Sequence, residues 1–411
     1  MENKGRNRKK SVWTKDFSCI TVSTILSAIG GEAMNLPISL LVFDETKSTL
    51  LSSLILVCGM LPDIIFPIWI APFIDKGNKK KWIVGLDAFM VLLYSFMGIW
   101  TLKHTFSYSL YIVFVLIVAM DSIIYQLAYD AWYPDLIPEG LEQKGYAVSS
   151  TIYPVVIVLM APVATFIYGR VQIGHIFFIV AFLTLVSVIV ECCISDPRKK
   201  ESESYTFSQY KEDIREGFSY LKKEKGIRNI YTYMSITNGA SNGVNVITQA
   251  YYQTQPWLTV TMLGFLKSAE MIGRVISGSL HYYNEIPRRK RFAFTKIVYL
   301  TYDAMDALLL FMPFPLMLLN RFICGGLGSA SATIRQSAVY SYLPENMRAR
   351  VNALFSVIFS LGGIFFQLAA GALGQVLPYR IVALILGMIT FICVFIFIII
   401  PGKNNRPVYE S

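Results

Sequence analysis

The sequence predicts an all-α membrane protein with twelve transmembrane helices in two pseudo-symmetric six-helix bundles. Three observations support this fold class: the composition, the length of the apolar blocks, and features that recur in both halves. Of the 411 residues, 54% are hydrophobic and 16% are charged, and the mean hydropathy is +0.50. The apolar blocks are about 20 residues long, which is enough to cross ~30 Å of hydrocarbon as a helix. Only helices and closed barrels satisfy their backbone groups in lipid.

The predicted spans divide evenly around one long polar stretch. The spans of the first half are 17–43, 49–74, 82–102, 108–133, 145–170 and 174–195. Those of the second half are 227–253, 257–281, 292–313, 315–340, 350–374 and 378–401. The first span would be ~40 Å long as a straight helix, so it must tilt or project from the bilayer. The chain therefore divides into an N-terminal bundle at 1–195, a cytoplasmic linker at 196–226 and a C-terminal bundle at 227–411.

The basic residues are distributed unequally between the two sides of these spans. Of the 37 Lys and Arg residues, 28 fall on the side of the two termini, four on the other side and five within spans. Because cytoplasmic loops carry an excess of Lys and Arg, both termini are predicted to lie in the cytoplasm of a multi-pass cell-membrane protein. The net charge of +10 has the same origin. We expect the lipid bilayer, and not nucleic acid, as its charged partner.

The linker contains one amphipathic segment. Phe207, Tyr210, Ile214, Phe218 and Leu221 recur at intervals of three and four, and charged residues occupy the intervening positions. This spacing predicts a helix with one apolar face. We expect it to lie on the cytoplasmic leaflet beside the basic linker, and a docking helix for a partner protein is the alternative.

Two features occur at the same place in each half. Pro-Glu pairs at 138–139 and 344–345 are 206 residues apart, and each precedes a charged patch and a new span. Basic triplets at 79–81 and 288–290 follow the second span of each half. Together these matches predict two repeats in parallel orientation.

The loop after the second span, APFIDKGNKK, resembles the loop motif of the major facilitator superfamily, Gly-x-Leu-Ala-Asp-Arg-x-Gly-Arg-Lys. Asn78 replaces the second Gly of the motif. The stretches EDIREGFSYLKKEKGIRNI and LPISLLVFDETKST are similar to the macrolide-efflux-like branch of the drug:proton antiporters. The antiporter motif of that branch centres on Gly-Pro in the fifth span, and here Ala161-Pro162-Val163-Ala164 departs from it.

The resemblance implies a secondary active transporter that works by alternating access and is not an enzyme. It further implies proton-coupled efflux of a small amphipathic compound or drug, an antiporter activity that gives antibiotic resistance, by a monomer without a cofactor. Uptake of a small polar metabolite by the same fold is one alternative, and a non-transporting membrane sensor or scaffold is another. By the same resemblance, the loop is a cytoplasmic gate in which Asp75 lies near helix ends of the opposite half. The gate residues would be Asp75, Lys76, Lys79 and Lys80, although the lysines could equally serve only to set topology.

Six acidic residues near the middle of predicted spans are candidates for proton coupling or substrate contact. They are Glu32, Asp63, Asp121, Glu270, Asp303 and Asp306. A charged side chain at mid-membrane costs ~2.5–3.5 kcal/mol on insertion scales, so each is a functional candidate, and a satisfied interhelical pair is the alternative. Glu32 and Asp63 have no basic neighbour at helical spacing and are the first choices.

The other intramembrane charges have local partners or lie near span ends. Lys267, Glu270 and Arg274 share one helical face and can pair with one another. Asp303 and Asp306 could share a proton or pair with Lys296 or Arg321. Near the cytoplasmic ends, gate or packing roles fit better, and the residues there are Asp87, Asp130, Glu191 and Arg335.

Two polar stripes are candidates for lining a central cavity. Asn238, Asn242, Asn245 and Gln249 are spaced four, three and four apart and form one face of the seventh span. Ser27, Gly31 and Asn35 repeat every four residues in the first span. By the resemblance these two spans line the cavity, and interhelical hydrogen bonding is the alternative. The three histidines are scattered and no Walker A sequence occurs, so we expect neither a metal site nor ATP hydrolysis.

Overall fold

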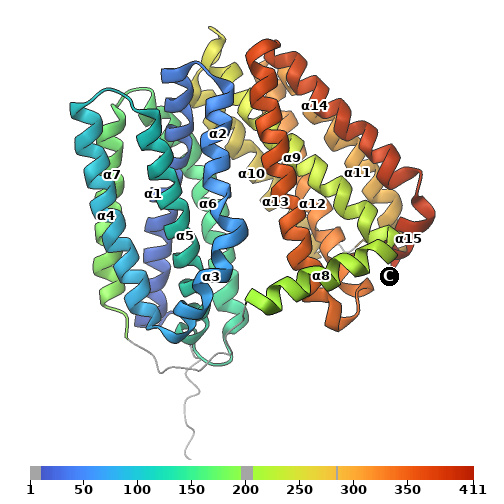
Figure 1. Ribbon diagram of the computed structural model, residues 1–411, viewed down its shortest axis with the longest axis horizontal. Coiled ribbons are helices and arrows are strands. Elements are labelled where there is room, and N and C mark those ends of the chain that lie inside the picture. Colours follow the sequence, from blue (N-terminus) through green and yellow to red (C-terminus); the bar gives the residue numbers. More distant parts are fainter. Residues whose placement is uncertain (1–10, 196–206, 284–285) are drawn as a thin grey trace, which may run out of the picture.

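The computed structural model describes residues 11–195, 207–283 and 286–411, and this part of the chain contains helices and no strand. In Figure 1 the helices up to α7 lie on the left and those from α9 onward lie on the right. The left part contains α1 (Lys15–Thr46), α2 (Thr49–Met60), α3 (Pro62–Lys76), α4 (Lys79–Lys103), α5 (Tyr108–Leu136), α6 (Glu142–Tyr168) and α7 (Ile173–Cys192). The rest contains α8 (Phe207–Lys223), α9 (Lys225–Thr254), α10 (Val260–Tyr283), α11 (Arg288–Leu308), α12 (Phe314–Tyr342), α13 (Glu345–Val376), α14 (Tyr379–Cys393) and α15 (Gly402–Glu410).

Seven helices of the described chain are long and apolar enough to cross a membrane. They are α1, α4, α5, α6, α7, α13 and α14 with its π-helical extension to Ile399. Amides on α9 and charges on α10 lower the hydropathy of these two helices, so they are not among the seven. The membrane spans expected there stay predictions. Those expected in α2–α3, α11 and α12 also stay predictions.

The predicted second span is a broken helix. The structure divides it into α2 and α3 at Leu61, whose N–H still bonds the carbonyl of Val57 at 3.0 Å. Pro62 follows as the first residue of α3 and has no N–H to donate to the preceding turn. The break therefore has a local cause in the sequence.

Short polar side chains define where several helices begin. The side chains of Thr14, Ser48 and Asn78 accept hydrogen bonds from the backbone N–H groups at the starts of α1, α2 and α4. Lys47 between α1 and α2 has φ of 53°, and its N–H bonds the carbonyl of Phe43. A left-handed residue at this position ends α1 and reverses the chain within two residues.

The described hydrogen bonds between the two parts gather toward one end of the molecule, the end with the α1–α2 turn. The Thr49 hydroxyl donates to the carbonyl of Gly371 at 2.6 Å, which joins α2 to α13. The Ser39 hydroxyl donates to the side-chain oxygen of Gln249 at 2.7 Å, which joins α1 to α9. This arrangement holds the two parts together on the side opposite the chain termini.

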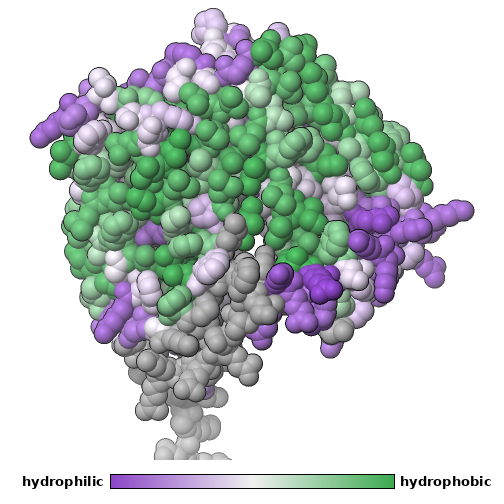
Figure 2. Space-filling model, viewed as in Figure 1, coloured by the Kyte–Doolittle hydropathy of each residue, from purple (hydrophilic) through white to green (hydrophobic). Residues whose placement is uncertain are grey.

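Large apolar side chains cover the outer surface of both parts. Figure 2 shows them over the central band of this face, with polar residues gathered at the top and at the lower right. Examples on different helices are Leu92 at 70% exposure, Phe182 at 65% and Phe365 at 66%. Exposed apolar belts of this kind are expected where lipid replaces water as the solvent.

The amphipathic segment forms α8 and packs partly on the second part of the chain. Leu221 is buried, Ile214 packs against the same core, and Phe218 points outward at 52% exposure. Glu216 of α8 forms an ion pair with Arg350 of α13. The apolar face of α8 is thus divided between a protein contact and an exposed side. Phe207 and Tyr210 have side chains outside the described residues.

Helices α10 and α12 pack through glycines, which gives a testable prediction. A Cβ at Gly325 would fall on the backbone carbonyl of Glu270, whereas a Cβ at Gly328 has only Tyr302 nearby, at 3.8 Å. We expect Gly325→Ala to lower the free energy of unfolding by ~1–3 kcal/mol, because the backbones must separate. Gly328→Ala in the same helix is the matched control and should leave stability unchanged or raise it by up to ~1 kcal/mol. Unfolding in detergent measures both, and equal stability of the two variants would contradict the packing.

Candidate functional site

A polar cavity of about 320 Å³ lies between the two parts of the molecule. Its walls come from α1 and α2 on one side and from α9, α10, α12 and α13 on the other. The polar residues that line it are Glu32, Asn35, Ser39, Asn242, Asn245, Thr248, Gln249, Lys267, Glu270, Arg321 and Gln367. Leu36, Leu56, Val246, Leu263 and Leu266 add apolar surface. The cavity can therefore accept a ligand with both polar and apolar groups.

Charges in this cavity meet across helices. The ammonium group of Lys267 on α10 interacts electrostatically with Glu32 on α1 and with Glu270 on its own helix. Glu270 also forms an ion pair with Arg274 at 2.8 Å, which confirms the predicted local pairing on α10. Glu32 thus has a cationic neighbour from the other part of the chain.

The amide stripe of α9 reaches the cavity over most of its length. Asn242, Asn245 and Gln249 line the cavity. Gln249 accepts a hydrogen bond from Ser39, so it also joins two helices. Asn238 lies beside α13, where its amide nitrogen is near Gly363. Cavity lining and interhelical bonding, the two interpretations of the stripe, are therefore both present along one helix.

Two smaller cavities adjoin the first one on the side of α1. One of about 220 Å³ is lined by Ser27, Gly31 and Asp121, and it shares Glu32 and Asn35 with the main cavity. The other, of about 300 Å³, is mostly apolar and also contacts Gly31 and Asn35. The polar stripe of α1 therefore lies along a connected set of cavities.

Three of the acidic candidates lie elsewhere in the structure. Asp63 is exposed in the first turn of α3. Asp303 is buried and accepts a hydrogen bond from the Tyr233 hydroxyl at 3.0 Å. Asp306 forms a buried ion pair with Arg321 at 2.6 Å, one of the two pairings that the sequence allowed. Lys296 lies over the ring of Phe292 instead.

The candidate gate loop is described only in part. The side chains of Asp75 and Lys76 lie outside the described residues, and so do the basic residues of the linker at 196–206. Lys80 donates hydrogen bonds to the carbonyls of Cys192 at 2.9 Å and Ile194 at 2.6 Å, at the end of α7. A cation is stabilised at a helix C-terminus. Lys80 therefore fastens the loop to its own half of the chain.

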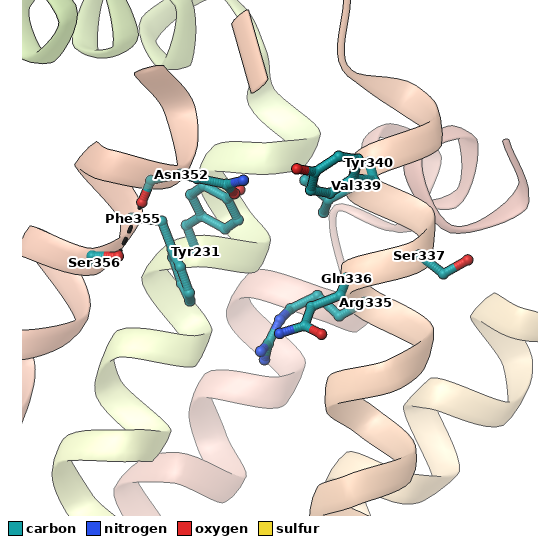
Figure 3. Close-up of a pocket in the computed structure, with 9 residues that line it drawn as sticks. All are labelled: Tyr231, Arg335, Gln336, Ser337, Val339, Tyr340, Asn352, Phe355 and Ser356. Carbon is teal, nitrogen blue, oxygen red and sulfur yellow. Dashed lines mark hydrogen bonds between the residues drawn. The ribbon is translucent and has the colours of Figure 1, made fainter. Parts of the chain in front are cut away.

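Two further cavities lie nearer the end where the termini are, one in each part. Figure 3 shows the larger, of about 600 Å³, in which Arg335 and Gln336 extend from α12 toward Tyr231 and Phe355, whereas Ser337 points away. The other, of about 490 Å³, lies in the first part. Six residues that line the larger cavity lie 206 positions later in the sequence than six residues that line the other cavity. The pairs are Tyr129 and Arg335, Asp130 and Gln336, Tyr133 and Val339, Tyr146 and Asn352, Ser149 and Phe355, and Ser150 and Ser356.

Reasoning from the sequence missed several members of these sites. The sequence spacing predicted that Lys267 pairs with Glu270, its neighbour along α10. Its interaction with Glu32 could not be predicted because Glu32 lies on another helix. The 206-residue offset relates Arg335 to Tyr129, but no feature of the sequence places either residue in a cavity wall. Asp87 and Glu191 were both predicted to have gate or packing roles, without any indication that they are neighbours, and the structure brings them together.

A helical membrane protein with a polar cavity between two parts has the architecture of a membrane transporter. The chain belongs to the Major Facilitator Superfamily, whose pattern it matches over residues 20–302 and 304–410. Transporters of this family bind small molecules and often protons, and they are not enzymes.

Known relatives agree with this assignment. Macrolide efflux protein A of Streptococcus pyogenes is 20% identical over 282 residues, which cover 67% of this chain and 69% of that protein. A peptide transporter has a TM-score of 0.70 at 10% identity, and 97% of each chain is covered. A bacterial homologue of the human lysosomal transporter Spinster, solved in an inward-facing and unoccupied conformation, has a TM-score of 0.63 at 12% identity, and 98% of each chain is covered. At these identities the solved structures establish the fold.

Proposed function

We propose that this protein is a secondary active transporter of the cell membrane that exchanges protons for a small amphipathic compound by alternating access. The observation that carries the proposal is the cavity between the two parts, where charges and amides lie beside apolar side chains. A drug with a cationic or hydrogen-bonding group on an apolar body fits such a wall. The weak likeness to a macrolide efflux protein supports the same substrate class and direction.

The proposed mechanism requires two halves that rock about the cavity. Hydrogen bonds between the parts gather on the side of the α1–α2 turn, so opening toward the other side breaks fewer of them. The matched cavities at an offset of 206 residues support two repeats in parallel orientation. In this proposal residues 1–195 and 227–411 are the two six-helix bundles of a monomer, the linker carries α8, and both termini face the cytoplasm.

Uptake of a small polar metabolite is the second candidate function. Lys267, Arg321 and several amides give the cavity the groups that would bind a carboxylate or hydroxyl-rich solute. Solved structures with a similar fold include a nucleoside transporter and a D-xylose-proton symporter. The polar side chains of the cavity wall favour uptake of a polar metabolite, and its leucines favour transport of an amphipathic compound.

A transport screen in proteoliposomes with an imposed pH gradient tests the proposal. We expect a macrolide or another amphipathic cation to accumulate inside the vesicles when the pH gradient drives protons out of them. A protonophore should abolish this accumulation. Protein-free vesicles control for passive partition into lipid. Flux that the protonophore leaves unchanged would contradict proton coupling, and accumulation of polar metabolites alone would favour uptake. Ligand binding without flux of any compound would indicate a sensor.

A further inference from the structure

Three buried carboxyl groups meet inside the first part of the chain. Asp87 on α4 is 6% exposed, Asp121 on α5 is 9% exposed and Glu191 on α7 is fully buried. Asp87 lies close enough to Glu191 to share a hydrogen bond with it, and Asp121 interacts electrostatically with Asp87. The helices therefore place three acids from three different spans in one cluster.

The neighbours of this cluster supply hydrogen bonds but no compensating charge. Within the described chain, none of the ion pairs includes any of the three acids. The hydroxyl of Ser23 donates to Glu191, and Tyr125 contacts the same carboxylate oxygen at 3.4 Å. The other titratable groups that face the cluster are Tyr94 of α4, Tyr129 of α5, Tyr153 of α6 and Glu32 of α1. All of them are neutral or acidic.

Each of the three acids also has one oxygen without a hydrogen-bond partner. These atoms are Oδ2 of Asp87, Oδ1 of Asp121 and Oε2 of Glu191. A buried carboxylate without a cation or donor is costly, and two carboxyl groups in contact cannot both be ionised in a low-dielectric interior. A single proton between Asp87 and Glu191 removes the repulsion and satisfies one of the open oxygens.

The cluster is connected to the proposed substrate cavity. Asp87 and Asp121 line the small cavity beside α1, and Glu32 lines both this cavity and the main one. Asp87, Asp121 and Glu32 thus line one cavity, and Glu32 and Asn35 are common to it and to the main cavity, which gives the cluster polar neighbours toward the substrate cavity. Release of the proton would leave two like charges between α4 and α7, both of which pack in the same bundle as α1.

We propose that Asp87 and Glu191 together form the site that binds the transported proton. This inference rests on the proposed proton-coupled transport and names the residues that couple it. The proton binds between a carboxylate oxygen of each residue, and on release it passes to water of the cavity by way of Asp121. Glu32 then contacts substrate, and Asp87 and Glu191 hold the proton.

Infrared difference spectroscopy of the purified full-length protein tests the site without any substrate. The wild type should show the C=O stretch of a protonated carboxylic acid that disappears at alkaline pH. Asp87→Asn and Glu191→Gln should each reduce this band by the part that the cluster contributes, whereas a part from Asp303, which is also buried without an ion pair, should remain. Asp135→Asn, at an exposed carboxylate on the end of α5, is the matched control and should keep the whole band. If both variants in the cluster keep the wild-type band, the proton lies elsewhere and the inference is wrong.

A second variant covers the case in which Glu191→Gln fails to fold. Ser23→Ala removes the hydroxyl that donates to Glu191 and should shift the band, whereas an unshifted band would contradict the site. In the proteoliposome assay, Asp87→Asn should bind substrate but lose the response to the pH gradient. If the wild type transports no compound, the proposed function is wrong. The infrared result would still decide which residues hold the proton.

Discussion

Asp306→Ala is expected to destabilise the protein by ~3–5 kcal/mol, the largest single effect that the structure predicts on stability. The ion pair with Arg321 measures 2.6 Å, and the two side chains are only 6% and 4% exposed. Removal of the carboxylate leaves a guanidinium in the protein interior, where the remaining charge of Glu270 compensates it only partly. Denaturation in mixed micelles, followed by circular dichroism, measures the loss.

Two comparisons distinguish the buried charge from a general loss of contacts. Glu410→Ala breaks the ion pair between Arg406 and Glu410, at 2.9 Å, in which Arg406 is 63% exposed. Exposed pairs contribute at most ~1 kcal/mol, so this variant should differ little from the wild type. Asp306→Leu combined with Arg321→Met replaces both charges by apolar groups and should recover most of the loss. Similar losses from Asp306→Ala and Glu410→Ala would show that burial does not determine the effect.

Features that depend on local sequence were the easiest to predict. Apolar length and the positive-inside bias indicated helical spans. α1, α4 and α5 contain the predicted ranges, and α6 and α7 cover all but the last two and three residues of theirs. The spacing within 207–221 indicated a helix, and α8 covers it. The pairing of Glu270 with Arg274 follows from an interval of four residues. These features need no knowledge of how distant segments pack.

The candidate site was predicted less completely because its chemistry depends on contacts between helices. Asp63 and Glu32 had equal standing in the sequence, since neither has a basic neighbour along its own helix. The structure places Asp63 on an exposed turn of α3 and Glu32 opposite Lys267 in the cavity. Asp87 and Glu191 are 104 residues apart, and helical spacing gives no information about contacts over such a separation. Only the 206-residue offset carries long-range information, because it relates equivalent positions of two repeats.

Lys267→Met should reduce transport by a factor of ten or more, the largest single effect expected on activity. The ammonium group and Glu32 line the same cavity and interact electrostatically. Loss of this charge removes a cationic neighbour of Glu32 and a contact for the ligand, and a tenfold effect corresponds to ~1.4 kcal/mol. Glu270 keeps Arg274 as a partner, so the loss should fall on Glu32 and on the ligand. Uptake of a radiolabelled macrolide into proteoliposomes with a pH gradient measures the effect.

A double-mutant cycle tests whether the loss arises from this pair. Glu32→Gln removes the charge that Lys267 compensates, so the double variant should be less impaired than the product of the two single effects predicts. Lys103→Met, at an exposed lysine at the end of α4, is the matched control and should transport like the wild type. Strictly multiplicative losses would mean that Glu32 and Lys267 act independently. In that case the cavity would bind its ligand through separate groups, and Glu32 would no longer connect the substrate with the buried acids behind it.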